Sequence, residues 1–468
     1  MKQAGSGSMA SVLACILALF LAAAMIPCAA ACEEPESLFE YRLLEDGSAV
    51  ITGYEGSEAD LAFPETLDGH PVSALGDSFD IRTASIRNLR SITVPDTMTV
   101  IEPGALQFAG YLEEIRIPED HPVLSFEDGA LYDKQAGSLL LFLQTNPAES
   151  FSVPEGIRSI GEKAFFRAGL VSVSFPGSVE RIAREAFYQC TRLSEVSLAE
   201  GLKTIETDAF TNCDKLREIV IPASVTEIEE APFTDAHLKE IRVAPGNPVF
   251  TVSGVALINI RDGVLIAYPH FSEAESCEIP KGVKRIGALA FYRSHNLKKI
   301  SFPEGLLEIG HGAFLMCNHL TAIELPDSII RLEEGAFGGN SDAETLRLPA
   351  GLAEITGNFD DLAITELEIP EGVTVIERSF TSLPNLREVT VPDSVKKIGN
   401  NSFAFCKNLS SIMIPAGVTE IGTTFTGCSE ALVIRTEPGS YAEEYCGEHL
   451  LNCELFHSEN GSHANPAQ

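Results

Sequence analysis

The chain has 468 residues, of which 45% are hydrophobic and 21% charged, a balance typical of a folded protein rather than a disordered one. Its 67 acidic residues outnumber its 33 Lys and Arg residues, so the formal net charge at pH 7 is −34. A surface this acidic repels phosphate backbones and anionic membranes, which argues against nucleic acid as a partner.

Residues 1–31 are predicted to be a secretory signal peptide. Val12 to Ile26 form an unbroken apolar run of 15 residues, followed by Pro27 and by the small residues Ala29 to Ala31. The run is short for a membrane-spanning helix. Two alternatives stay open: an uncleaved N-terminal anchor, and lipidation of Cys32, which follows three alanines much as in the lipobox of a bacterial lipoprotein. The sequence therefore predicts an exported protein, either secreted or held at the cell surface.

Residues 32–80 are predicted to form an N-terminal cap and a first, degenerate repeat. Two short runs, Phe39 to Tyr41 and Ser48 to Ile51, have the residue pattern of a hairpin, and Tyr54 follows them. Such a hairpin would shield the open end of the stack that comes after it.

Residues 81–435 restate one pattern about every 23 residues. Phenylalanine recurs at steps of 21 to 23 residues, at Phe165, Phe187, Phe210 and Phe233 and again at Phe291, Phe314, Phe337, Phe359, Phe380, Phe403 and Phe425. Prolines keep a matching spacing at Pro280, Pro303, Pro326, Pro349, Pro370, Pro392 and Pro415. Each unit contains a short strand that cannot bury its apolar side alone, so we expect the units to stack into a solenoid with one continuous core.

The repeated pattern L-x-x-I-x-I-P, V-x-x-I-G, A-F-x-x-C resembles the BspA-type, or treponemal-type, leucine-rich repeats of bacterial cell surfaces and some parasitic protists. The resemblance covers about residues 39–456. Matching pairs are Ile160-Gly161, Ile286-Gly287, Ile309-Gly310, Ile398-Gly399, Ile421-Gly422, Ala164-Phe165, Ala186-Phe187, Ala290-Phe291 and Ala313-Phe314. The pairs Pro232-Phe233, Asn358-Phe359 and Thr424-Phe425 depart from the Ala-Phe of the pattern, but the spacing of the repeat is kept. The resemblance implies a β-rich solenoid with short parallel strands and short helical turns, and a surface protein that binds or adheres.

Three further segments interrupt or end the repeat. Two coils are longer, near residues 118–154 and 244–280, and their short β-rich runs split by Gly129 and Gly254 predict an added hairpin on each coil. Residues 436–457 are predicted to be a C-terminal cap with a closing helix, and residues 458–468 a disordered tail.

The cysteines favour packing over chemistry. Five of them stand three residues after the repeated Phe, in a slot that elsewhere holds Ala, Ser, Asn or Leu: Cys190, Cys213, Cys317, Cys406 and Cys428. A free cysteine in such a slot acts as a small hydrophobe. Cys446 and Cys453 lie seven residues apart in the cap and are candidates for a disulfide, with two free thiols as the open alternative.

No stretch of the sequence carries a catalytic, metal-binding or cofactor-binding pattern. The chain lacks a His-Glu-x-x-His helix, a Cys-x-x-Cys pair, a phosphate loop and a nucleophile elbow. The ten histidines share no spacing, and the glycines recur at one repeat position rather than in a single loop. We therefore predict no catalytic residues, no metal ligands and no cofactor.

The candidate partner-binding residues are polar side chains that face out of the repeated strands. They are Glu195, Glu218 and Glu240 from three successive coils, Arg242 beside them, and Lys299, Glu366 and Glu388 in later coils. Strands about 4.8 Å apart bring the glutamates close enough to repel each other unless a cation lies opposite. Two interpretations stay open: an acidic binding surface, and a solvated face on which Arg242 and Arg116 partly neutralise the carboxylates.

The size of the repeat permits a binding function. About thirteen coils with a rise of about 4.8 Å give a sheet about 60 Å long, and a face of about 1,000 Å² exceeds the roughly 800 Å² that each partner buries in a standard interface. The first hypothesis is a monomeric, non-enzymatic module that recognises a protein or glycoprotein on host or neighbouring cells. An envelope-associated scaffold and a surface hydrolase that uses carboxylates are the alternatives. Any membrane contact would come only from an N-terminal lipid or an uncleaved anchor.

Overall fold

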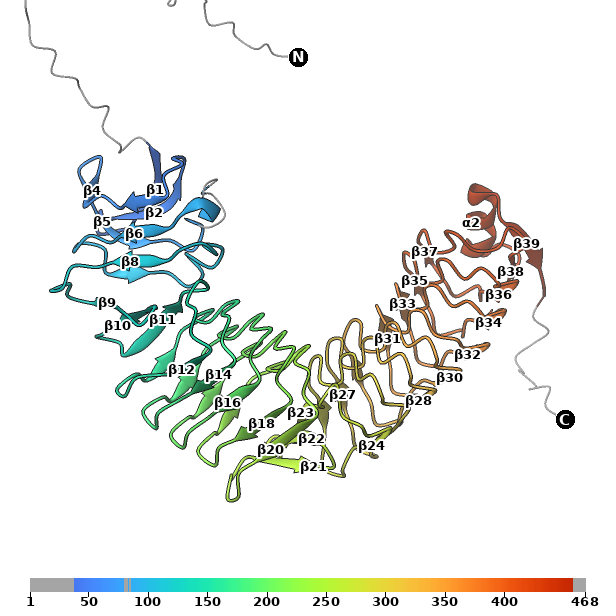
Figure 1. Cartoon of the computed structure of the whole chain (residues 1–468). Coiled ribbons are helices and arrows are strands. Elements are labelled where there is room, and N and C mark those ends of the chain that lie inside the picture. Colours follow the sequence, from blue (N-terminus) through green and yellow to red (C-terminus); the bar gives the residue numbers. More distant parts are fainter. Residues whose placement is uncertain (1–37, 80–82, 84–85, 458–468) are drawn as a thin grey trace, which may run out of the picture.

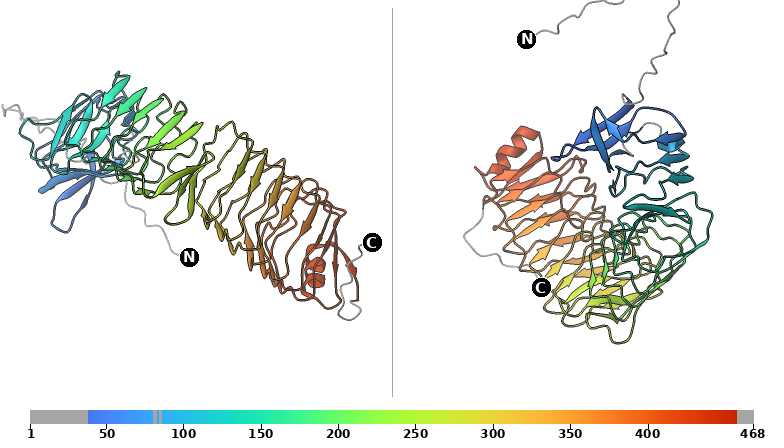
Figure 2. Two further views of the ribbon diagram at one scale, coloured as in Figure 1. Left: turned by 90° about the horizontal axis from the view of Figure 1, so that it is seen from below. Right: turned by 90° about the vertical axis from the view of Figure 1, so that its left-hand side faces the viewer.

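The computed structural model describes residues 38–79, 83 and 86–457. The predicted signal peptide, Cys32 and the tail at 458–468 lie outside these residues. The coils stack into an elongated arc that is open on one side (Figures 1 and 2). The solenoid has about 17 turns of about 23 residues, more than the thirteen expected, because both caps also contribute strands to the ladders.

One side of every coil carries a short strand, and these strands form the first ladder, in which neighbouring strands run parallel. The strands are β3 (Asp60–Ala62), β6 (Ser91–Thr93), β8 (Glu114–Arg116), β12 (Ser150–Ser152), β14 (Ser172–Ser174), β16 (Glu195–Ser197), β18 (Glu218–Ile221), β20 (Glu240–Val243), β24 (Ser276–Glu278), β26 (Lys299–Ser301), β28 (Ala322–Glu324), β30 (Thr345–Arg347), β32 (Glu366–Glu368), β34 (Glu388–Thr390), β36 (Ser411–Met413), β38 (Val433–Thr436) and β39 (Asn452–Leu455).

A second strand in each coil forms the second ladder, again with parallel neighbours. It comprises β2 (Ala49–Tyr54), β5 (His70–Leu75), β7 (Val100–Ile101), β11 (Ser138–Phe142), β13 (Ser159–Ile160), β15 (Arg181–Ile182), β17 (Thr204–Ile205), β19 (Glu227–Ile228), β23 (Val264–Ala267), β25 (Arg285–Ile286), β27 (Glu308–Ile309), β29 (Arg331–Leu332), β31 (Glu354–Thr356), β33 (Val375–Glu377), β35 (Lys397–Ile398) and β37 (Glu420–Ile421). In the C-terminal half, this ladder follows the inner side of the arc and the first ladder the outer side (Figure 1).

The strands are short because the alternation of buried and exposed residues lasts only a few residues in each repeat. In β18, Ile219 and Ile221 are buried while Glu218 and Val220 are exposed, the period of two expected for a strand with one buried face. Pro222 follows directly and cannot donate a backbone hydrogen bond, so strand pairing ends there. Each coil therefore offers one outward-facing pair of side chains and buries the other.

The repeated phenylalanines form a buried column, as the period predicts. The ring centroids of Phe165 and Phe187 lie 4.7 Å apart at an interplanar angle of 9°, and those of Phe187 and Phe210 lie 5.1 Å apart at 3°. Phe233 continues the column 5.9 Å from Phe210. In the coil of the second insert Tyr268 takes the Phe position, with its ring 4.8 Å from that of Phe291. The centre of the core is thus a column of stacked aromatic rings that runs from coil to coil.

The turn around each Phe is compact and contains little regular helix. Backbone hydrogen bonds join successive turns, such as those from Phe165 N to Ala186 O and from Phe187 N to Ala209 O, both 2.8 Å long. Each turn also holds left-handed residues four positions apart, for example Lys163 at φ 57° and Arg167 at φ 56°. The left-handed conformation prevents a right-handed helix from forming. Many successive coils are therefore joined on three sides, by the two ladders and by the Phe turn.

Two antiparallel hairpins interrupt the first ladder inside the predicted insert ranges. They are formed by β9 (Leu124–Glu127) and β10 (Ala130–Asp133), and by β21 (Phe250–Ser253) and β22 (Ala256–Asn259). Each hairpin continues into a second-ladder strand, β11 or β23. The buried hydrophobic residues form three clusters, and the boundaries between these clusters fall at the two inserts. The inserts therefore divide the solenoid into three stretches.

Both ends of the described chain are capped. At the N-terminus β1 (Phe39–Leu43) pairs with β2, and β4 (Thr66–Leu67) with β5; a 3-10 turn, η2 (Ile86–Asn88), follows. At the C-terminus the Ser440 side chain caps α2 (Tyr441–His449), and β39 then adds a last strand beside β38. No helix in the described segments is both long and apolar enough to cross a membrane.

Candidate functional site

Four of the seven predicted partner-binding residues form an acidic strip on the first ladder. We define the strip as Glu195, Glu218 and Glu240 together with Arg242. Glu218 and Glu240 are direct neighbours across β18 and β20, and all four side chains are exposed. Glu195 lies on β16 in the preceding coil, although β16 and β18 are not paired in a single sheet.

Arg242 partly neutralises the strip. Its guanidinium group lies 2.7 Å from a Glu240 carboxylate oxygen and 3.4 Å from one of Glu218. The hydrogen bonds from Arg242 lower the pKa of Glu240, and the same pairing raises the pKa of Arg242. One arginine faces three glutamates, so the strip keeps a net negative charge. The face is thus acidic and also partly paired, so both interpretations of the sequence stay open.

The remaining predicted residues lie elsewhere on the same ladder. Lys299 on β26 is separated from Glu240 by the second insert and by β24. Glu366 and Glu388 are neighbours across β32 and β34, farther along the arc. All three side chains are exposed. The structure therefore divides the predicted set into a strip before the insert and separate positions after it.

The Glu-Ile-Arg arrangement occurs before both inserts. In β8, Arg116 lies 2.7 Å from Glu114 of its own strand and 3.9 Å from Asp60 of β3, two strands away. Arg242 of β20 likewise contacts Glu240 of its own strand and Glu218 of β18. Both arginines thus contact carboxylates of two strands in the last coil before an insert. The sequence predicted Arg116 and Arg242 as neutralisers, but not that both precede an insert.

Four surface clefts lie around the second insert. Clefts of about 510 Å³ and 310 Å³ lie between β20 and β21, and two more of about 420 Å³ lie on the far side of the hairpin. β20 and β21 lie at the outer edge of the arc (Figure 1). The acidic strip thus ends at two of these clefts, which Glu240 lines.

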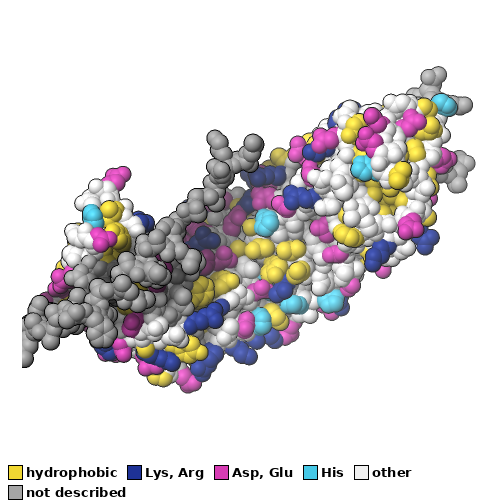
Figure 3. Space-filling model, turned by 90° about the horizontal axis from the view of Figure 1, so that it is seen from above, with side chains coloured by type: hydrophobic (Ala, Val, Ile, Leu, Met, Phe, Trp, Pro, Cys, Tyr) yellow, Lys and Arg dark blue, Asp and Glu magenta, His cyan; other side chains and the backbone are white. Residues whose placement is uncertain are grey.

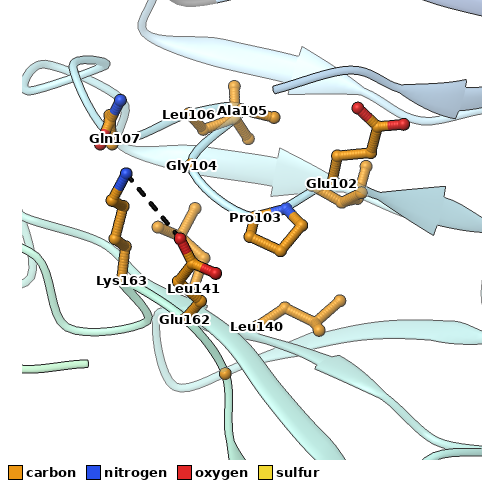
Figure 4. A pocket seen from close by; sticks show the side chains of 12 residues that line it. Glu102, Pro103, Gly104, Ala105, Leu106, Gln107, Leu140, Leu141, Glu162 and Lys163 are labelled. Atoms are coloured by element: carbon orange, nitrogen blue, oxygen red, sulfur yellow. Dashed lines mark ion pairs between the residues drawn. The ribbon is translucent and has the colours of Figure 1, made fainter. Parts of the chain in front are cut away.

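A much smaller cavity lies beside the first insert. It has a volume of about 60 Å³ and is lined mainly by apolar residues, including Leu106, Leu140 and Leu141. Figure 4 shows Lys163 and Glu162 at its edge, with 4.0 Å between the Lys163 Nζ and a carboxylate oxygen of Glu162. A cavity of this size holds a few water molecules at most. It is too small for a cofactor.

The open side of the arc carries a mixed surface. Figure 3 shows hydrophobic side chains gathered along its middle, bordered by side chains of both charges. Within the described residues, no group of three or more His, Cys, Asp or Glu side chains is placed to hold a metal ion.

The cysteine slot has a role that the sequence analysis missed. The thiol of each slot cysteine donates a hydrogen bond to the Phe carbonyl of the preceding coil, as from Cys190 to Phe165 at 2.9 Å and from Cys317 to Phe291 at 2.9 Å. Asn340 makes the same contact with the Phe314 carbonyl at 3.0 Å. In most coils this position holds Cys, Ser or Asn, whose side chains can donate a hydrogen bond, and this pattern was the available signal in the sequence. The slot therefore links coils as well as filling space.

The slot thiols are expected to resist alkylation in the folded protein. Burial raises the pKa of Cys190 and of Cys317 to about 12, so both thiols stay protonated at neutral pH, and the thiolate is the reactive form. Exposed Cys453 should react with iodoacetamide first. Peptide mass mapping after timed labelling checks this order, and rapid labelling of Cys190 in the native state would contradict it.

Cys446 and Cys453 both carry free thiols, and the two groups are hydrogen-bonding neighbours. Cys446 is a buried residue of α2, while Cys453 on β39 is exposed. This proximity raises the pKa of Cys446, after burial as the main cause. The disulfide between them stays a prediction for an oxidising environment.

A histidine cluster beside the second insert was also missed, because its members share no spacing. The Phe271 ring lies between two imidazoles, 4.2 Å from His237 and 4.7 Å from His295. His270 is buried beneath them, and its Nδ1 has no hydrogen-bond partner among the described residues. Burial, and then the nearby His295, His237 and Arg293, lower the pKa of His270 to about 3. The cluster depends on a loop that packs across two coils, which periodicity cannot reveal.

Comparison with known proteins identifies the repeat. The model of the BspA type leucine-rich repeat region matches residues 140–251, 267–380 and 356–446, more than half of the chain. Among solved structures, a leucine-rich repeat protein from Eubacterium ventriosum is 20% identical, with a TM-score of 0.54 over 84% of this chain and 93% of that one. At this identity the likeness shows the fold.

Two further solved structures are similar at lower TM-scores. The pneumococcal vaccine antigen PcpA is 18% identical, with a TM-score of 0.48 over 90% of this chain and 96% of that one. A leucine-rich cell surface protein from Faecalibacterium prausnitzii is 23% identical, with a TM-score of 0.44 over 87% of this chain and 95% of that one. No protein of curated function matches the chain.

Proposed function

Because the chain belongs to the BspA-type leucine-rich repeat family, we propose that it is a non-enzymatic binding module, exported or held at the cell surface, that recognises a protein or glycoprotein. The observation that carries this proposal is the acidic strip, which lies exposed on the first ladder and ends at the clefts of the second insert. Recognition would use a regular face rather than a single pocket, as repeat proteins commonly do.

The dimensions of the solenoid support recognition of a macromolecule. About 17 turns with a rise of about 4.8 Å per strand give a ladder about 80 Å long. The area of a face of this length exceeds the roughly 800 Å² that one partner buries in a standard interface. The net charge of −34 favours a partner with a basic contact surface.

Export is the part of this proposal that rests on the sequence. The apolar run from Val12 to Ile26 and the three alanines before Cys32 support passage through a membrane, followed by cleavage or lipidation. The slot cysteines are free thiols that are mostly buried, and burial protects them from oxidation. They are therefore compatible both with secretion and with attachment at the cell surface.

The test reverses the charge of the strip. We expect the triple variant Glu195→Lys, Glu218→Lys and Glu240→Lys to bind immobilised extracellular-matrix proteins and mucin at least about 10-fold more weakly, a loss of about 1.4 kcal/mol. Biolayer interferometry with the mature chain measures this change. The double variant Glu324→Lys and Glu368→Lys is the control, because it reverses exposed glutamates on the same ladder that are not candidate binding residues. Unchanged binding by the triple variant would refute the role of the strip.

A further inference from the structure

The break in the first ladder leaves two strand edges facing each other. β20 pairs with β18 and β21 pairs with β22, and neither has another partner among the described strands. The six residues 244–249 join β20 to β21, yet the two strands do not pair. We call β20, β21 and the groove between them the fork.

Backbone groups on both sides point into the fork. Glu240 N donates to Arg217 O at 3.2 Å and Ala244 N donates to Ile221 O at 2.8 Å, so the alternating backbone groups of Ile241 point away from β18. On the other side, Ile260 N donates to Val249 O at 2.9 Å. By the same alternation, the backbone N–H and C=O of Val252 point away from β22.

The groove has the length and lining for an extended chain. Clefts of about 510 Å³ and 310 Å³ are lined by residues of both strands. Ile241 and Phe250, each 2% exposed, form an apolar floor, and the half-buried Val252 and Val255 stand beside it. Each strand is four residues long, which corresponds to about 13 Å of extended chain.

The charges around the fork favour a basic occupant. Lys239 at its edge is already paired with Glu273 at 3.1 Å, so this pair adds no net charge. The acidic strip leads into the fork with three glutamates against Arg242 alone. A strand added beside β20 would place its outward side chains next to Glu240, where a basic residue is favoured and an acidic one is repelled.

We propose that the fork binds an extended, basic segment of a partner protein by β-strand addition, with main-chain hydrogen bonds to Ile241 and Val252 and a Lys or Arg beside Glu240. Edge strands with unpaired backbone groups are ready sites for such pairing. This inference rests on the proposed function in taking the partner to be a protein. It assigns the contact to one place on the solenoid.

The probe is the capped peptide Lys-Val-Lys-Val-Lys-Val, titrated by calorimetry and followed by amide hydrogen exchange. We expect binding to slow exchange at Ile241 and Val252, and Val252→Pro to weaken binding at least about 10-fold by removing an edge donor. Proline is tolerated best at an edge position of this kind, so the variant should stay folded, which circular dichroism checks. Unchanged affinity in folded Val252→Pro, or protection confined to other coils, would overturn the proposal.

Two protein variants and two modified peptides are the controls for this test. Val252→Ala keeps the amide and should bind within about 3-fold of the wild type. Phe126→Pro places proline at the matching edge position of the first insert and should bind normally; a loss there instead would move the site and refute the proposal. The same peptide with alternate backbone N-methyl groups, or with Glu in place of Lys, should not bind wild-type protein. Equal binding of the N-methylated peptide would exclude strand addition even if the proline variant failed to fold.

The two proposals fail in different ways. If the matrix proteins do not bind but the peptide protects Ile241 and Val252, the proposed function is wrong and the fork is a strand-addition site. If matrix binding depends on the acidic strip but is insensitive to Val252→Pro, and no peptide protection is seen, the proposed function stands and the inference about the fork is wrong.

Discussion

Replacing Phe187 by alanine is expected to lower the free energy of unfolding by about 3–5 kcal/mol. The Phe187 side chain is fully buried, and its ring is stacked between those of Phe165 and Phe210 at 4.7 Å and 5.1 Å. Truncation removes both stacking contacts and leaves a cavity that rigid neighbouring coils cannot close. Because each coil contacts only its neighbours, the loss should also loosen the coils on either side. Urea denaturation with hydrogen exchange measures both effects.

Phe405→Ala is the matched control for this prediction. Phe405 lies in an equivalent turn but its side chain is 50% exposed, outside the buried column. Its removal should change the free energy of unfolding by less than about 1 kcal/mol. Similar losses in the two variants would show that the column does not carry the stability of the stack.

Lowering the pH from 7 to 5 is expected to destabilise the protein by about 2 kcal/mol through His270 alone. Burial holds the folded-state pKa of His270 at about 3, below its ordinary value of 6.5. Between these two values the unfolded chain binds a proton that the folded chain does not. The stability is therefore fully present above about pH 6.5 and falls as the pH decreases toward the folded pKa.

The variant His270→Asn should make this contribution disappear. It removes the titrating ring from a site that faces His295, His237 and Arg293, so the difference in unfolding free energy between pH 7 and pH 5 should shrink by about 2 kcal/mol. His270→Gln, a second side chain that does not titrate, should behave alike. Chemical denaturation at the two pH values measures the difference. An unchanged difference in both variants would show that His270 does not control the acid sensitivity.

The parts of the fold that the sequence predicted are those that every coil repeats. The Phe spacing located the buried column, and the strand pattern located alternating residues such as Ile219 and Val220. Turn geometry was missed because left-handed positions such as Lys163 and Arg167 carry residues with no strong preference for that conformation. A period reveals which residues are buried, but it does not reveal the backbone angles between them.

The candidate site was predicted only in outline. Outward-facing Glu218 and Glu240 followed from strand alternation, and the structure brings them side by side. The fork was not predicted, because the separation of β20 from β21 depends on how the second hairpin packs rather than on the residues of either strand. His270 was missed for a similar reason, since its neighbours come from different coils.

The three-sided attachment of successive coils has a consequence for how such a gene can change. Most junctions between regular coils use similar contacts, so the gain or loss of a block of about 23 codons by recombination would leave flanking coils that can still stack. Each such event would alter the reach of the arc by about 4.8 Å while leaving the fork intact, provided that it falls away from the two inserts. Length can therefore evolve separately from recognition.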